Sequence, residues 1–112
     1  MTIHIIEDDP GVRDALAELV AGLGYAVRSY KDGESFLDVE PPQPADVVLV
    51  DLGLPGMSGS KIISWLKALG QPPRIVVISG RSQSDIDVAL RGLPDLPLLR
   101  KPLAPEALAA LL

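Results

Sequence analysis

Hydrophobic residues in this chain gather in five short runs, and these runs alternate with segments in which apolar residues recur at helical spacing. Short apolar runs bounded by turn residues predict β-strands, and a period near 3.6 residues predicts amphipathic helices. We expect strands at residues 3–6, 25–30, 46–51, 75–78 and 96–99, and helices at residues 10–23, 32–39, 60–69, 82–90 and 105–112. This alternation predicts right-handed βαβ crossovers, and therefore an α/β fold with a doubly wound parallel sheet and helices on both faces.

Turn and capping residues mark the ends of several of these elements. Asp9 followed by Pro10 is a helix-start signal, with Asp as the N-cap and Pro at the first helical position. Gly24 is expected to end the first helix, and Gly92 and Pro94 are expected to cut the fourth helix short. The third apolar run is uninterrupted, as in a central strand that helices cover on both faces, whereas the second run alternates and is expected at an edge.

The composition narrows the class of protein. A length of 112 residues predicts a single domain, and 47% hydrophobic residues are enough for a core. No apolar run approaches the ~20 residues of a membrane span, and the acidic N-terminus does not resemble a signal peptide, so we expect a cytoplasmic protein. The net charge of −5 argues against direct nucleic-acid contact by this domain. The absence of Cys and the single His exclude thiolate and multi-His metal sites.

Chemically active side chains follow four of the five predicted strands. The first strand ends at Glu7-Asp8, the third at Asp51, the fourth at Ser79 and the fifth at Lys101. In open parallel sheets, ligand sites form outside the carboxyl ends of the strands, so these residues are expected to converge in one crevice. A carboxylate can attack phosphorus and form an acyl phosphate, and Asp51, at the end of the central strand, is the first candidate for this role.

The acidic pair predicts a site for a divalent cation. Adjacent carboxylates such as Glu7 and Asp8 repel each other, and a cation relieves that repulsion. Mg²⁺ prefers oxygen ligands in an octahedron, usually one or two carboxylates with waters and phosphate oxygens. Asp8, Asp51 and a loop carbonyl would satisfy this preference, whereas Asp9 is explained by its capping role.

The remaining candidates carry weaker signals on their own. The hydroxyl of Ser79 can hydrogen-bond a phosphoryl oxygen, although Ser after a strand is usually a turn residue. A Lys can pair with phosphate or a carboxylate, and the Lys101-Pro102 pair favours a cis peptide that would aim the Lys side chain inward. His4 is expected in the core or at its flank rather than in catalysis, and Met57 and Trp65 are expected to be packing residues.

Taken together, these motifs resemble the receiver domain of response regulators in two-component signalling, which has a CheY-like fold. The motifs that carry the resemblance are Glu7-Asp8-Asp9-Pro10, Asp51 with Leu54-Pro55-Gly56-Met57-Ser58-Gly59, Ser79-Gly80 and Lys101-Pro102. The N-terminal half is most similar to FixJ-type receivers, through Val12-Arg13-Asp14-Ala15-Leu16 and Gly33-Glu34-Ser35-Phe36-Leu37. The resemblance implies a sheet of strand order 2-1-3-4-5.

The resemblance also implies roles for individual residues. Asp51 would be the phospho-acceptor, Ser79 the switch hydroxyl and Lys101 the phosphate-pairing cation. An Mg²⁺ or Mn²⁺ ion would be held by Glu7, Asp8, Asp51 and the Gly53 carbonyl. Such domains take the phosphoryl group from a sensor histidine kinase and catalyse only their own phosphorylation and dephosphorylation. The chain would be the N-terminal part of a longer regulator that controls transcription through a DNA-binding domain, and phosphorylation would promote homodimer formation.

Two features depart from the family pattern. Receivers usually carry Tyr or Phe three residues before the Lys, and here Leu98 stands at that position. The stretch at residues 92–97, which is rich in Pro, replaces the usual small-residue turn before the fifth strand. We therefore expect a switch that involves Ser79 and Leu98 without an aromatic rotamer change, on the face of the fourth helix, fifth strand and fifth helix. An apolar cluster there, Leu93, Leu96, Leu98 and Leu99, is a candidate dimer surface.

Two other functions compete with this reading. A receiver-like interaction module that works without phosphate is compatible with Leu98 and its neighbouring prolines, but every residue needed for phosphorylation is present. A Mg²⁺-dependent phosphatase of the haloacid-dehalogenase kind uses similar residues. There, however, the nucleophile comes early in a DxD pair, whereas here the acidic pair comes first and Gly53 stands at the second Asp position.

Overall fold

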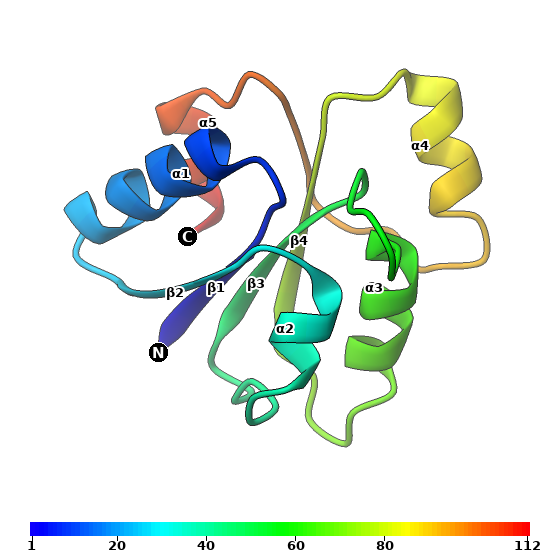
Figure 1. Cartoon of the computed structure of the whole chain (residues 1–112), viewed down its shortest axis with the longest axis horizontal. Helices are drawn as coiled ribbons and strands as arrows, with labels where there is room; N and C mark the ends of the chain where they lie inside the picture. Colours follow the sequence, from blue (N-terminus) through cyan, green and yellow to red (C-terminus); the bar gives the residue numbers. More distant parts are fainter.

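The computed structural model describes all 112 residues and contains a five-stranded sheet with five helices (Figure 1). The strands are β1 (Thr2–Ile6), β2 (Ala26–Tyr30), β3 (Val47–Asp51), β4 (Arg74–Ser79) and β5 (Leu98–Arg100). The helices are α1 (Pro10–Gly22), α2 (Gly33–Leu37), α3 (Gly59–Lys67), α4 (Gln83–Ala89) and α5 (Pro105–Leu111). The strand order is β2-β1-β3-β4-β5 and all neighbouring pairs are parallel, which confirms the predicted CheY-like sheet.

Helices cover both faces of the sheet, as the uninterrupted apolar strands predicted. α1 and α5 cover one face, and α2, α3 and α4 cover the other (Figure 1). Alternate residues of each central strand serve opposite cores, so Ile5 faces α1 and α5 while Ile6 faces the other three helices. β3 is buried along its whole length and places its last residue, Asp51, at the middle of one edge of the sheet.

Four helices begin at polar N-caps that the sequence supplies. The side chains of Asp9, Asp32, Ser58 and Ser82 each accept a hydrogen bond from a backbone N–H in the first turn. α5 has no side-chain cap and begins with Pro105, which has no N–H to satisfy. These caps start α1, α3 and α4 directly after strands β1, β3 and β4, with only short connecting loops that hold the strand-end residues in place.

Gly59 allows the N-terminus of α3 to approach the end of β3. A Cβ atom at this position would lie 2.5 Å from the Asp51 carbonyl oxygen and 3.0 Å from the Leu52 Cα. Real Cβ atoms do not come this close to a backbone oxygen, so only glycine fits here without displacing α3 or the strand. The backbone position of Asp51 therefore depends on a residue that has no functional group of its own.

Two sequence-based boundaries are corrected by the structure, and the expected early end of the fourth helix is confirmed. β5 begins at Leu98 rather than residue 96, because Pro97 has no N–H and contributes only its carbonyl, which accepts from Val77 N. α3 ends at Lys67 rather than residue 69, since the last turn tightens and Leu69 N bonds Leu66 O. α4 is short, and Gly92 takes a positive φ of 82° just beyond it, as expected from its sequence.

The predicted leucine cluster is divided between the two faces of the sheet. Leu93, Leu96 and Leu98 are half-buried and pack against the core beneath α2, α3 and α4. Leu99 is buried in the opposite core, beneath α1 and α5. The four leucines therefore do not form one exposed surface. None of the helices combines the length and hydrophobicity that crossing a membrane requires.

Candidate functional site

The carboxyl ends of four strands bring the candidate residues to one edge of the sheet. Glu7 follows β1, Asp51 ends β3, Ser79 ends β4 and Lys101 follows β5. The register between β4 and β5 fixes the last of these, because Lys101 N donates a hydrogen bond to Ser79 O over 2.9 Å. The parallel sheet thus juxtaposes side chains that lie far apart in the sequence, as predicted for the mouth of an open α/β sheet.

Lys101 joins the two buried carboxylates of the site. Its Nζ lies 2.5 Å from Glu7 Oε1 and 3.3 Å from Asp51 Oδ2. Glu7 is completely buried and Asp51 nearly so, while the Lys101 side chain is about one-quarter exposed. The Lys101–Pro102 peptide bond is cis. A partly accessible cation therefore lies against an almost enclosed pair of acids.

Burial and mutual contact shift the pKa values of these three groups in different directions. Burial raises the pKa of the Glu7 carboxyl to about 7, and the neighbouring Asp51 carboxyl acts in the same direction, against Lys101. Burial also disfavours ionisation of Asp51, but the neighbouring Glu7 carboxyl, the hydrogen bond from the Gly53 amide and the Lys101 charge outweigh it and lower the Asp51 pKa. For Lys101, burial is outweighed by both carboxylates, which raise its pKa.

These directions describe one shared proton. Of the two acids, Glu7 is the one that takes up a proton as the pH falls below about 7, while Asp51 remains ionised and Lys101 remains charged. An ionised Asp51 has a free oxygen lone pair, which is the state that a nucleophile requires. The arrangement keeps the carboxylate at the end of the central strand reactive even though it is buried.

The acidic residues have the composition and spacing of a cation site. One carboxylate oxygen from each of Glu7, Asp8 and Asp51 lies within 4.8 Å of the others, and Asp8 is exposed to solvent. The second oxygen of Glu7, Oε2, is buried and has no hydrogen-bond partner. Buried polar atoms are almost always paired, so this orphaned oxygen fits a site that a ligand completes. Hard oxygen donors of this kind suit Mg²⁺.

Gly53, in the loop after β3, lies beside the Asp51 carboxylate. Gly53 N donates a hydrogen bond to Asp51 Oδ1 over 3.0 Å, and a Cβ atom on Gly53 would lie only 3.6–3.7 Å from the two Asp51 carboxylate oxygens. Farther along the loop, Glu34 of α2 accepts a hydrogen bond from Met57 N over 2.9 Å. α2 thus anchors a loop whose first residues border the acidic site.

Ser79 lies at the site but points its hydroxyl elsewhere in this state. The residue is fully buried, and its Oγ accepts a hydrogen bond from Arg81 N over 3.0 Å. It makes no hydrogen bond to Asp51, unlike Lys101 and the Gly53 amide. The structure therefore brings Glu7, Asp51 and Lys101 into direct contact, whereas Ser79 is adjacent to them and bonded within its own loop.

Leu98 borders a cavity between α4 and the segment that leads into β5. The cavity has a volume of about 400 Å³, and it is lined on its apolar side by Ile86, Leu90, Leu93, Leu96 and Leu98. Two acidic residues, Asp87 and Asp95, also line it. Leu98 therefore packs against the core and also borders unfilled space.

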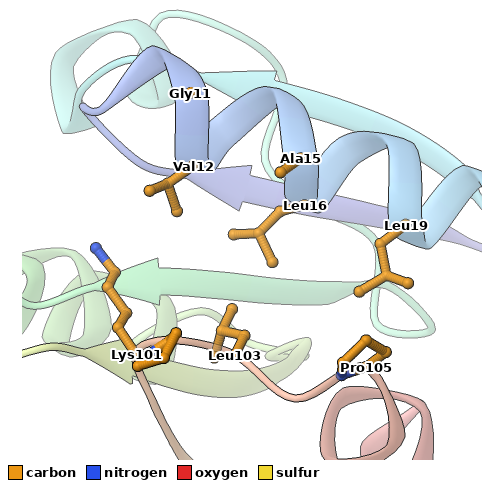
Figure 2. A pocket seen from close by; sticks show the side chains of 9 residues that line it. Gly11, Val12, Ala15, Leu16, Leu19, Lys101, Leu103 and Pro105 are labelled. Atoms are coloured by element: carbon orange, nitrogen blue, oxygen red, sulfur yellow. The ribbon is translucent and has the colours of Figure 1, made fainter.

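A second cavity runs along the other side of the site. Figure 2 shows Val12, Leu16 and Leu19 of α1 pointing toward Leu103 and Pro105 across a groove of about 460 Å³. Lys101, which contacts Asp51, also lines this groove. One end of an apolar groove is thus continuous with the charged site.

Sequence reasoning missed three contributions. Arg13 contacts the backbone of the acidic turn, and Glu34 anchors the loop after β3. His4 was expected in the core, and there it is paired with Asp46, whose role was not anticipated. The contact made by Arg13 had one available signal in the sequence, which is an Arg in the first turn of a helix, where the helix dipole disfavours positive charge. The other two pairings depend on the packing of distant segments.

Comparison with known proteins places these residues in a family context. Residues 3–112 match the family described as response regulator receiver domain. The chain is 30% identical to FixJ of Azorhizobium caulinodans over 98% of its own length and 52% of the relative, and 31% identical to the tetrathionate response regulatory protein TtrR of Salmonella typhimurium over 99% and 54%. A solved CheY-like receiver from Methylobacillus flagellatus superposes with a TM-score of 0.83 at 26% identity, covering 99% of this chain and 94% of that one. The chain spans about half the length of the relatives it matches.

Proposed function

This chain belongs to the response regulator receiver domain family, and from this premise we propose that it accepts a phosphoryl group on Asp51 from a sensor histidine kinase. A receiver domain is not a conventional enzyme, because the group that it modifies is its own side chain. Family membership therefore sets aside the phosphatase of the haloacid-dehalogenase kind. The observation that carries the proposal is the contact of Lys101 with both Asp51 and Glu7 at the end of the central strand.

The residues of the site divide the work of phosphoryl transfer. An ionised Asp51 oxygen forms the new bond to phosphorus while the bond from phosphorus to the donor nitrogen breaks, and the released imidazole keeps the bonding electron pair and takes a proton from solvent. Lys101 offsets negative charge on the phosphoryl oxygens, and Ser79 can donate a hydrogen bond to one of them. Catalysis in such a site consists of positioning and charge neutralisation.

A divalent cation fits the same arrangement. Glu7, Asp8, Asp51 and the backbone carbonyl of Gly53 would hold Mg²⁺ or Mn²⁺, and the ion, when bound, supplies positive charge next to the transferred group. The orphaned oxygen of Glu7 supports this proposal, because a ligand is expected to complete it. With the cation present, the proton on Glu7 would be displaced to solvent.

The apolar groove beside Lys101 is the surface that we assign to the kinase. A kinase must bring its phosphohistidine within bonding distance of Asp51, so its docking surface must lie next to the site. The groove between α1 and residues 101–105 meets that condition, since Lys101 lines it and also contacts Asp51 (Figure 2). Its apolar side chains offer the hydrophobic contact that helix docking requires.

We propose that phosphorylation alters the surface formed by α4, β5 and α5. Ser79, whose Oγ accepts a hydrogen bond from Arg81 N, would donate its hydroxyl proton to a phosphoryl oxygen, and the loop after β4 would move with it. Leu98 could then repack into the cavity beside α4, which takes the place of an aromatic rotamer change. The output would be transcriptional control through a further domain, since two of the relatives are named transcriptional regulatory protein FixJ. We also propose a phosphorylation-dependent homodimer and a location in the cytoplasm.

The proposal is tested by chemical labelling. The protein is incubated with acetyl phosphate and Mg²⁺, and its intact mass is measured; one phosphoryl group is expected on the wild type and none on Asp51→Asn. Asp38→Asn, an exposed aspartate on α2's C-terminal end, is the matched control and should label normally. Equal labelling of Asp51→Asn would reject the assignment. Absence of labelling in the folded wild type would favour the interaction module that works without phosphate.

A further inference from the structure

Arg13, in the first turn of α1, makes hydrogen bonds to three consecutive carbonyl groups. Its backbone N donates to Asp9 O over 2.8 Å, and its Nη1 donates to Glu7 O over 3.0 Å, with a longer contact of 3.5 Å to Asp8 O. The residue is half-buried. A single side chain and its own amide therefore tie down the whole turn between β1 and α1, which is the turn that carries the acidic pair.

The position of Arg13 is unfavourable for a helix considered alone. The N-terminus of a helix carries partial positive charge, so a cationic side chain in the first turn is disfavoured. Arg has five N–H donors in a rigid planar fork, and hydrogen bonds from a charged donor to carbonyl oxygens are stronger than neutral ones. The contacts with Glu7 O and Asp8 O are thus the interactions that offset the helix dipole at this position.

These contacts restrict the side chains of the acidic pair. Fixing the carbonyl of a residue fixes the peptide plane that follows it, and with it the direction in which the neighbouring side chains leave the backbone. Glu7 N is held as well, since it donates to Tyr30 O over 3.0 Å. The exposed Asp8 has no side-chain partner that could orient it, so its backbone is the only part of it that the protein holds.

We propose that Arg13 is a positioning residue that holds the Glu7–Asp8 turn in the conformation that binds the divalent cation. The inference rests on the proposed function, because it assigns the same acidic site to a cation. Arg13 binds backbone carbonyls and is not a ligand. Partners that orient the ligands of a metal commonly change its affinity when mutated, although they never touch the ion.

A purely electrostatic role for Arg13 predicts the opposite result. A positive charge near the acidic cluster repels a cation, so neutralising it would increase Mg²⁺ affinity. If Arg13 instead acts by positioning the turn, its removal would decrease the affinity for Mg²⁺, because the ligands must then be ordered when the ion binds. Arg13→Gln removes both charge and fork, whereas Arg13→Lys keeps the charge and removes the fork. The pair of variants therefore separates the two effects.

Two measurements test the proposal. Titration of MgCl₂ into the protein by calorimetry gives the dissociation constant, and we expect it to rise about tenfold in both Arg13→Gln and Arg13→Lys. Amide hydrogen exchange on the metal-free protein is the second readout, and peptides covering residues 7–13 should exchange faster in both variants while peptides from β4 do not change. Arg28→Gln is the charge-matched control, because Arg28 is exposed in β2 and makes no side-chain hydrogen bond; it should leave both readouts unchanged.

The outcomes distinguish this inference from the proposed function. Tighter Mg²⁺ binding by Arg13→Gln with no change in Arg13→Lys would establish the electrostatic role and overturn the positioning role of Arg13. Unchanged dissociation constants and unchanged exchange in both variants would overturn it as well. If the wild type labels on Asp51 and binds Mg²⁺ but the variants bind equally well, only the inference fails. If the folded wild type binds no Mg²⁺, the cation site fails and the inference fails with it.

Discussion

His4 and Glu7 are three residues apart in the chain, yet they belong to buried polar clusters of opposite character. His4 lies within β1, where Nε2 is 2.9 Å from Asp46 Oδ2 and Nδ1 is 3.2 Å from Tyr30 Oη. Asp46 also accepts hydrogen bonds from the backbone amides of Thr2 and Gln43. Glu7 lies just past the carboxyl end of β1. Its Oε1 contacts Lys101, but its Oε2 has no hydrogen-bond partner.

The difference between the clusters concerns what remains to be satisfied. In the cluster of His4, Tyr30 and Asp46 every polar atom has a partner from the protein, so the cluster holds the strands together and has nothing left to bind. In the cluster of Glu7, Asp51 and Lys101 an oxygen is orphaned, and two carboxylates share a single cation. Buried charge without full pairing is costly, and it persists where function requires it. We therefore interpret the first cluster as structural and the second as the candidate functional site.

The largest effect that we expect is a loss of stability when the cluster of His4, Tyr30 and Asp46 is disrupted. Asp46→Ala would leave the amides of Thr2 and Gln43 and the His4 ring without their acceptor, and we expect a loss of about 2–4 kcal/mol in the free energy of unfolding. Urea unfolding measures this loss. Glu40→Ala, an exposed carboxylate removed from a loop, is the control and should change stability by less than about 0.5 kcal/mol.

The two clusters should also separate by function in that variant. At a temperature where Asp46→Ala remains folded, it should still accept a phosphoryl group from acetyl phosphate. A folded Asp46→Ala protein that no longer labels would show that the clusters are coupled and that their division into structural and functional is wrong.

Magnesium, by binding at the cluster of Glu7, Asp51 and Lys101, should raise the free energy of unfolding by less than Asp46→Ala lowers it. A ligand at ten times its dissociation constant adds about 1.4 kcal/mol to the free energy of unfolding, which corresponds to several degrees in Tm for a domain of this size. We expect this rise in wild type and in Asp46→Ala, and its loss in Asp8→Ala. Thermal unfolding with and without MgCl₂ measures it, and a full Mg²⁺ response in Asp8→Ala would remove Asp8 from the site.

In the metal-free protein, the contributions of the two clusters to folding stability should change with pH in opposite directions. The pKa of Glu7 is raised from 4.5 to about 7, so the folded state binds more protons than the unfolded state between these values. The contribution of Glu7 to stability is therefore greatest at acidic pH and is lost as the pH rises from about 4.5 to about 7. The lowered pKa of Asp46, where hydrogen bonds from His4 and two amides outweigh burial, gives stability that is lost as the pH falls below about 3.8.

Glu7→Gln isolates this effect, because Gln cannot titrate. Urea unfolding of wild type and Glu7→Gln at several pH values from 4.5 to 7.5, without metal, should show the wild type losing stability relative to the variant as the pH rises. A constant difference across this range would contradict the shared proton on Glu7. Added Mg²⁺ should reduce the loss, since the cation replaces the proton.

Activation should give the smallest and most local effect. Beryllofluoride with Mg²⁺ mimics the phosphoryl group, and we expect changes in amide exchange centred on residues 79–100, beside Ser79 and Leu98. The peptides that carry His4 and Asp46 should exchange as before, because that cluster has no unsatisfied group to reorganise. Changes confined to residues 25–39 would contradict the proposed switch surface and favour the phosphate-independent module.

The sequence predicted which side chains converge at the carboxyl ends of the strands better than it predicted the residues that surround them. Asp51, Ser79 and Lys101 were identifiable because each follows a strand, and the topology of a doubly wound sheet places all strand ends together. The start of β5 was missed because the apolar residues before it suggested a strand, while Pro97 cannot donate to the ladder. Local patterns are sufficient where position along a strand decides the outcome.

Pairings between distant segments could not be predicted in the same way. The contact of His4 with Asp46 depends on the register of β1 against β3 and on the path of residues 41–46, which no local pattern determines. The shared proton on Glu7 depends on complete burial, which follows from packing rather than from residue type. The division of Leu98 and Leu99 between two faces depends on where β5 begins, since one residue of register reverses the face.

Gly59 has no functional group, yet its position makes the domain sensitive to missense mutation. Because a Cβ atom there would lie 2.5 Å from the Asp51 carbonyl oxygen, every missense change of this codon adds atoms against the backbone of the proposed phospho-acceptor. The tolerance of position 59 to substitution is thus tied to that of position 51, even though one residue is inert and the other is the proposed nucleophile. Among descendants of this sequence, we therefore expect selection for signalling to preserve glycine at position 59 as well as the carboxylate at position 51.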